Sequence, residues 1–96
     1  MEALPFNLKP KYFKQLKSGQ KKFEFRKAST KYNCESLAKG REAIFIDESG
    51  QNEPISGRIK SYEFVRVDSL LFSQREAVKD YYGNIEYVFK IEVELC

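Results

Sequence analysis

The sequence predicts an α+β fold, a small mixed barrel of five to six strands with two short helices. The segments run in the order strand, helix, strand, loop, strand, strand, helix, strand. Successive strands lie too close together for the helical crossovers of an all-parallel sheet. Fourteen aromatic residues (six Tyr and eight Phe) can fill a small barrel with few side chains. Because 96 residues support one modest core, we expect a single domain over residues 1–96.

The first elements are a strand and a helix. Residues 3–8 form an apolar lead-in that favours a strand. Pro10 suits the first turn of a helix, where a missing N–H group costs nothing. We expect this helix near residues 10–18, with Gly19 as its left-handed stop. Its inward stripe consists of Tyr12, Phe13 and Leu16.

A strand is predicted over residues 22–27, directly after the helix stop. Phe23 and Phe25 alternate with Glu24 and Arg26, so the two charges share one strand face. This pattern is compatible with a solvated surface ion pair, which stabilises a protein little. It is equally compatible with a polar cluster at the mouth of a pocket.

The middle of the chain predicts two further strands. Ala43–Ile46 is a continuous apolar run, typical of a strand buried on both faces or in a barrel wall. Residues 55–67 predict a long bent strand, with Gly57 as a plausible bulge. The expected buried residues are Phe13, Leu16, Phe25, Ile44, Ile46, Phe89 and Ile91.

The last third predicts a helix and a strand. Ser73 and Glu76 are spaced as a capping box, so we expect a helix near residues 73–82, ended by Gly83. The final strand alternates clearly. One face carries Ile85, Tyr87, Phe89, Ile91, Val93 and Leu95, and the other carries Glu86, Val88, Lys90, Glu92 and Glu94.

Charge and composition narrow the possible functions. The net charge is +3, but residues 9–31 carry nine cations against Glu24 alone, which permits a phosphate-bearing partner. The chain has no histidine, which excludes Ser-His and Cys-His nucleophiles. With only two distant cysteines, Cys34 and Cys96, we expect no metal and no cofactor. Lacking a signal segment or a long apolar run, the chain is expected to be cytoplasmic, with free thiols and no membrane partner.

The motif G-x-K-x-x-E-x-R runs from Gly19 to Arg26 and follows an aromatic-apolar helix. The segment from Leu8 to Arg26 resembles the signature of the ASCH domain, a family of the PUA-like β-barrel superfamily. The resemblance continues more weakly through Lys39–Arg41, the late helix and the closing strand, so it covers the whole chain. It implies a pseudo-barrel whose cleft is lined by the charged motif residues and binds RNA or a modified nucleoside.

The candidate ligand-binding residues are Lys21, Lys22, Glu24 and Arg26. Lys21 would hold a phosphate or carbonyl oxygen, or act as a base if desolvation lowers its pKa. Lys22 competes for that role, because strand alternation places it beside Glu24. Glu24 would accept hydrogen bonds from the exocyclic amine of a base, while Arg26 would fix a carbonyl or phosphate.

Two alternatives to binding alone remain open. One branch of the family hydrolyses acetylated cytidine with a lysine, a threonine and a glutamate. Lys21 occupies the position of that lysine, whereas Glu24 stands at the threonine and the catalytic glutamate has no clear counterpart. The second hypothesis is therefore a small hydrolase, an amidohydrolase on acylated cytidine or a ribonuclease, with Lys21 and Glu24 as the catalytic acid–base pair. The third is a protein-interaction module.

Further residues are weaker candidates. The hydroxyls of Ser29 and Thr30 suit a turn better than catalysis. Four tyrosines could stack on a base but are more often part of a core. These are Tyr32, Tyr62, Tyr81 and Tyr82. A basic track could continue along the long strand through Arg58, Lys60 and Arg66, although a solvated strand face explains them better.

Overall fold

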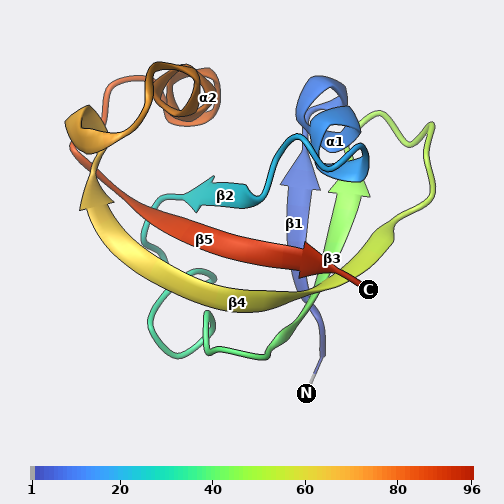
Figure 1. Ribbon diagram of the computed structural model, residues 1–96. Coiled ribbons are helices and arrows are strands. Elements are labelled where there is room, and N and C mark those ends of the chain that lie inside the picture. Colours follow the sequence, from blue (N-terminus) through green and yellow to red (C-terminus); the bar gives the residue numbers. More distant parts are fainter. Residues whose placement is uncertain (1) are drawn as a thin grey trace.

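The computed structural model describes residues 2–96 and contains one curled five-stranded sheet with two helices (Figure 1). The strands are β1 (Leu4–Leu8), β2 (Phe23–Arg26), β3 (Glu42–Asp47), β4 (Ile55–Arg66) and β5 (Tyr87–Leu95). The helices are α1 (Pro10–Lys17) and α2 (Phe72–Tyr82), with a 3₁₀ turn at Val67–Ser69. The sheet order is β1-β3-β4-β5-β2, in which β1 and β3 are parallel and the other pairs antiparallel. The expected mixed sheet and two helices are confirmed, and the sheet forms a half-barrel.

Helix α1 follows its sequence signals. It begins at Pro10, and its buried face consists of Tyr12, Phe13 and Leu16, as expected. After Lys17 the chain turns at Gly19, whose φ of 84° is in the left-handed region that glycine tolerates best. The N–H group of Gly19 bonds the carbonyl of Leu16 at 3.1 Å, so the turn closes the end of the helix.

Helix α2 begins one residue earlier than expected, at Phe72. The predicted capping box between Ser73 and Glu76 is therefore wrong. Gln74 occupies the third helical position, and its Oε1 accepts a hydrogen bond of 3.2 Å from the N–H group of Leu71. This bond is one half of a capping box, and the other half is missing because the side chain of Leu71 has no hydrogen-bond acceptor. Gly83 ends the helix as expected.

Strand β3 is not buried on both faces. Ala43, Phe45 and Asp47 are buried, whereas Ile44 and Ile46 are half-buried, so the expectation that these two isoleucines are core residues is wrong. The alternation of a strand decides which side chains face the interior of the curl. The outer face of β3 is only partly covered, and two isoleucines there lengthened the apolar run in the sequence.

The core consists of two clusters separated by the sheet. The larger cluster fills the inside of the curl and includes Phe6, Phe13 and Phe45. The smaller cluster joins β2 and β5 to α2 through Phe25, Val78 and Val88.

Strand β5 contributes to both clusters, because its two faces are both covered. Phe89, Ile91 and Val93 belong to the inner cluster, as the alternation predicts. Val88, expected on the polar face, is buried, whereas Tyr87 and Leu95 at the strand ends are exposed. Alternation predicts which face of a strand a residue lies on. Whether that residue is buried also depends on whether a neighbouring element covers this part of the strand.

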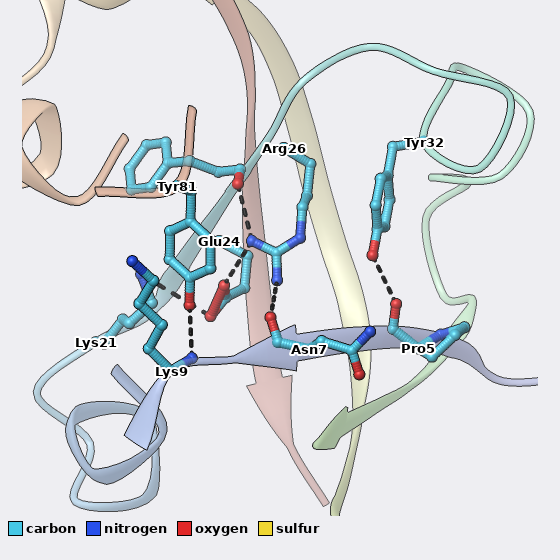
Figure 2. A network of polar contacts seen from close by, with 9 residues as sticks. Pro5, Asn7, Lys9, Lys21, Glu24, Arg26, Tyr32 and Tyr81 are labelled. Carbon is cyan, nitrogen blue, oxygen red and sulfur yellow. Dashed lines mark hydrogen bonds and ion pairs between the residues drawn. The ribbon is translucent and has the colours of Figure 1, made fainter. Parts of the chain in front are cut away.

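Strands β1 and β2 end the sheet order and have no backbone pairing with each other. Side chains satisfy the free edge of β1 instead. Arg26 Nη2 donates to the carbonyl of Asn7 at 3.1 Å, and the Tyr32 hydroxyl donates to the carbonyl of Pro5 at 2.7 Å. The N–H group of Lys9 donates to the Tyr81 hydroxyl at 2.9 Å. We call this set of three contacts the seam (Figure 2).

Candidate functional site

Three charged residues of the sequence motif converge in the structure. Lys21 Nζ lies 3.9 Å from Glu24 Oε1, and Arg26 Nη1 lies 3.4 Å from Glu24 Oε2. Figure 2 shows Glu24 between the two cations, with the Tyr81 ring beside them. We call Lys21, Glu24 and Arg26 the charge cluster.

The turn after α1 places Lys21 at the start of this cluster. The N–H groups of Gln20 and Lys21 both bond the carbonyl of Gln15, at 2.9 and 3.1 Å. The chain therefore folds back over the end of α1 before it enters β2. From there, strand alternation sends Glu24 and Arg26 to the inner face and Phe25 to the cluster beneath α2.

The cluster is buried, so the interpretation of Glu24 and Arg26 as a solvated surface pair is wrong. The exposed fraction is 1% for Glu24 and 3% for Arg26. Arg26 also donates from Nη1 to the carbonyl of Phe25 at 2.9 Å. Three aromatic rings lie 5.2 to 5.6 Å from its Cζ, those of Phe6, Tyr32 and Tyr81. The N–H groups of this guanidinium are thus directed to the carbonyls of Phe25 and Asn7 and to the Glu24 carboxylate.

Burial shifts the two titratable partners in opposite directions. Burial raises the pKa of Glu24, although the charges of Lys21 and Arg26 oppose this shift. Burial lowers the pKa of Lys21, although the charge of Glu24 opposes this shift. Neither carboxylate oxygen of Glu24 has a hydrogen-bond partner among residues 2–96. A buried carboxylate without such partners is costly, and proton transfer between Lys21 and Glu24 becomes easier.

A groove of about 570 Å³ lies beside the cluster, between α1, the turn before β2, β2 itself and the start of α2. Lys21 lines the groove, whereas Glu24 and Arg26 lie behind it. Its walls combine three cations, one carboxylate and several apolar side chains. They are Lys11, Lys21 and Lys22, then Glu76, and then Phe23, Phe25, Leu71, Phe72 and Ala77. Lys22 is exposed, away from Glu24, so it contributes to the groove rather than to the charge cluster.

Most of the weaker candidates have structural partners. The Ser29 hydroxyl accepts the N–H groups of Lys31 and Tyr32, which is a turn role. Tyr32 is buried with its hydroxyl in the seam, so it offers no free ring face for stacking. Lys60 pairs with Glu92 and Arg66 pairs with Asp68, at 3.8 and 3.2 Å.

Thr30, Tyr62, Tyr82 and Arg58 lie outside both the charge cluster and the groove. Within residues 2–96, no group of three or more His, Cys, Asp or Glu side chains is placed to hold a metal ion. Neither helix of this part of the chain has the length and hydrophobicity needed to cross a membrane.

Lys11, Leu71 and Phe72 line the groove but are not among the candidate site residues predicted from the sequence. Leu71 and Phe72 are each 69% exposed, which is unusual for large apolar side chains. In the sequence, these two large apolar residues come directly before the expected helix at 73–82 and do not belong to its inward face. This position was the available indication that they are exposed. Lys11 is an exposed residue of α1, and only the position of α2 shows that it borders a groove.

Comparisons with known proteins identify the family. The ASCH domain model matches residues 6–95. Two solved structures from Zymomonas mobilis, of ASCH and of a mutant ZmASCH protein, each superpose with a TM-score of 0.70 at 16% identity. The alignments cover 94% of this chain but only 65% and 67% of the two longer chains. No curated protein matches the sequence. The family model spans nearly all of the sequence, and the chain therefore belongs to the ASCH domain family.

Proposed function

We propose that this ASCH domain binds RNA or a nucleotide-like ligand in the groove. The observation that carries the proposal is the lining of the groove, in which Lys11, Lys21 and Lys22 stand beside the exposed Phe72. Ammonium groups attract phosphate, and aromatic faces stack on bases of any sequence. A volume of about 570 Å³ lies within the usual range of small-molecule sites.

Glu24 supports the same proposal from behind the wall of the groove. Both of its oxygens lack hydrogen-bond partners among the described residues, so they remain available to a donor. The exocyclic amine of a base is such a donor, and it would reach Glu24 only where Lys21 yields space. Lys21 would then contact a phosphate or carbonyl oxygen of the same ligand.

The test is a salt titration of binding to single-stranded RNA and to nucleotides. Lys22→Ala and Phe72→Ala should each weaken binding by about 1–3 kcal/mol, because each removes a charged or stacking contact. Lys22→Ala should also reduce the slope of log affinity against log salt by about 1. Lys14→Ala is the matched control, since Lys14 is an exposed lysine of α1 outside the groove. Equal losses for Lys14→Ala and Lys22→Ala would contradict the groove as the binding site.

Hydrolysis is the second candidate function, favoured by the opposite pKa shifts of Lys21 and Glu24. Neighbouring groups with such shifts often form the acid–base pair of an enzyme. The substrates to test are acylated cytidines and RNA. Glu24→Gln should abolish turnover while RNA binding persists, because the amide keeps the shape but transfers no proton. Absence of both turnover and low-salt binding would favour the protein-interaction hypothesis.

A further inference from the structure

Lys21 differs from the other lysines near the groove. Its side chain is only 11% exposed, and its Nζ lies 5.4 Å from the Tyr12 ring and 5.3 Å from the Phe25 ring. By contrast, Lys11 and Lys22 line the same groove as exposed side chains. Lys21 is therefore a desolvated amine in the wall of an open groove.

The charged and titratable side chains around Lys21 come from three elements. Glu24 and Arg26 face it from β2, and Tyr12 faces it from α1. Glu76 of α2 lies across the groove. Asp80 is occupied elsewhere, because the Tyr12 hydroxyl and Lys11 both contact its carboxylate. Glu24 is the one carboxylate within ion-pair distance of Lys21 in the part of the chain that the structure describes.

We propose that Lys21 is a nucleophile that forms an imine with an aldehyde carried beside a phosphate group. This inference rests on the proposed function, because both assume that the lysines of the groove bind the phosphate group of the ligand. Lysines act in this way where an apolar surrounding and a second cation favour the free amine. Tyr12 and Phe25 supply the first condition here, and Arg26 supplies the second.

The reaction balances with Glu24 as the proton carrier. The Lys21 ammonium first passes a proton to the Glu24 carboxylate, which lies 3.9 Å away. The free amine then adds to the carbonyl carbon, and one proton moves from nitrogen to oxygen. Protonated Glu24 returns its proton to the new hydroxyl group, the C–O bond breaks and water leaves. The products are an iminium cation on Lys21, one water and the original carboxylate, so no oxidant or reductant is required.

The walls of the groove specify the class of ligand. Lys11 and Lys22 lie along the same groove as Lys21, so an anionic group can be held while Lys21 reacts. Two sources offer an aldehyde beside a phosphate. One is a free phosphorylated aldehyde, and the other is an abasic site in a nucleic-acid strand, whose ring-opened sugar lies between two phosphates.

The experiment traps the imine with borohydride. Pyridoxal phosphate, pyridoxal and a single-stranded oligonucleotide with one abasic site are incubated separately with the intact chain. After reduction, peptide mapping by mass spectrometry locates the adducts. Lys21 should be modified faster than Lys14 at neutral pH, because burial lowers the pKa of Lys21 and so leaves more of its amine unprotonated. Pyridoxal phosphate should react faster than pyridoxal, and the two phosphate-bearing probes identify which source the groove accepts.

Two variants and one control test the assigned roles. Lys21→Arg should remove the adduct while circular dichroism shows a folded protein, and Lys14→Arg should leave the Lys21 adduct unchanged. Glu24→Gln should slow adduct formation without changing the position of the adduct. The proposal is overturned if neither phosphate-bearing probe modifies Lys21 faster than Lys14.

Binding of intact RNA, measured in parallel, separates the two proposals. RNA binding without a preferential Lys21 adduct would leave the proposed function standing and overturn this inference. A preferential Lys21 adduct without binding of either RNA or nucleotides would support this inference and contradict the proposed function.

Discussion

At the residue scale, Glu24 couples the stability of the fold to pH. Burial raises its pKa above the ordinary value of 4.5, so the folded chain binds more protons than the unfolded chain at pH values between the two. Stability must therefore fall as the pH rises from 4.5 toward the raised pKa. Lys21 acts in the opposite sense below its ordinary pKa of 10.5, because there the folded chain binds fewer protons.

We predict that Glu24→Gln flattens the decrease in stability above pH 4.5, because the amide has no proton to lose. The measurement is the free energy of unfolding by urea, taken in steps between about pH 4 and pH 8. Glu53→Gln, at an exposed position in the turn before β4, is the matched control. Parallel curves for the wild type and Glu24→Gln would contradict the prediction.

The grouping of the charge cluster could be predicted from the sequence, but its burial could not. Strand alternation correctly placed Glu24 and Arg26 on one face. It could not show that both faces of β2 are covered, because Tyr81 and Val78 come from a helix some fifty residues later. Burial decides whether such a pair is a weak surface contact or a desolvated pair whose pKa values are shifted.

At the element scale, Gly57 determines how closely β4 approaches its neighbours. A Cβ atom at this position would lie 2.5 Å from the carbonyl oxygen of Glu94 and 2.7 Å from a ring carbon of Phe45. The predicted bulge at Gly57 is therefore wrong. The irregularity lies between Ile59 and Ser61, and glycine is needed for close approach instead.

We predict that Gly57→Ala destabilises the protein by about 1–3 kcal/mol, since one extra methyl group forces β4 away from β5 or displaces Phe45. Urea unfolding measures the loss. Ser56→Ala, at the adjacent exposed position, tests whether alanine itself disturbs this strand. Similar stability for Gly57→Ala and the wild type would show that the strands adjust without cost.

At the scale of the whole molecule, the seam replaces the backbone pairing that would close the sheet. Arg26 is central to it, because one guanidinium contacts Asn7 of β1, Phe25 of β2 and the Glu24 carboxylate. Removing one partner from a buried pair leaves an uncompensated charge, which costs more than the pair contributes.

We predict that Arg26→Met and Glu24→Leu each destabilise the fold by about 3–5 kcal/mol, whereas the double variant loses much less than the sum. The measurement is a double-mutant cycle of unfolding free energies. Additive losses would show that the two side chains act independently. Because Asn7 loses its donor both in Arg26→Met and in the double variant, that contribution cancels in the coupling energy.

The arrangement of the strands was the least predictable property of the molecule. Each strand was expected near its observed place, since local alternation and turn residues mark it. The sheet order depends instead on pairings between distant residues, such as Leu4 with Ala43 and Phe23 with Glu92. No local pattern specifies that β5 lies between β4 and β2.

This order has a consequence for folding during synthesis. Strand β2 hydrogen-bonds only to β5, the last of the five strands to leave the ribosome. Until then Glu24 and Arg26 remain hydrated, and β1, β3 and β4 can already associate. Long-range pairing of this kind slows folding, because a large loop must close before any contact forms. We therefore expect the charge cluster to assemble last, so that the candidate site is complete only when the sheet is complete.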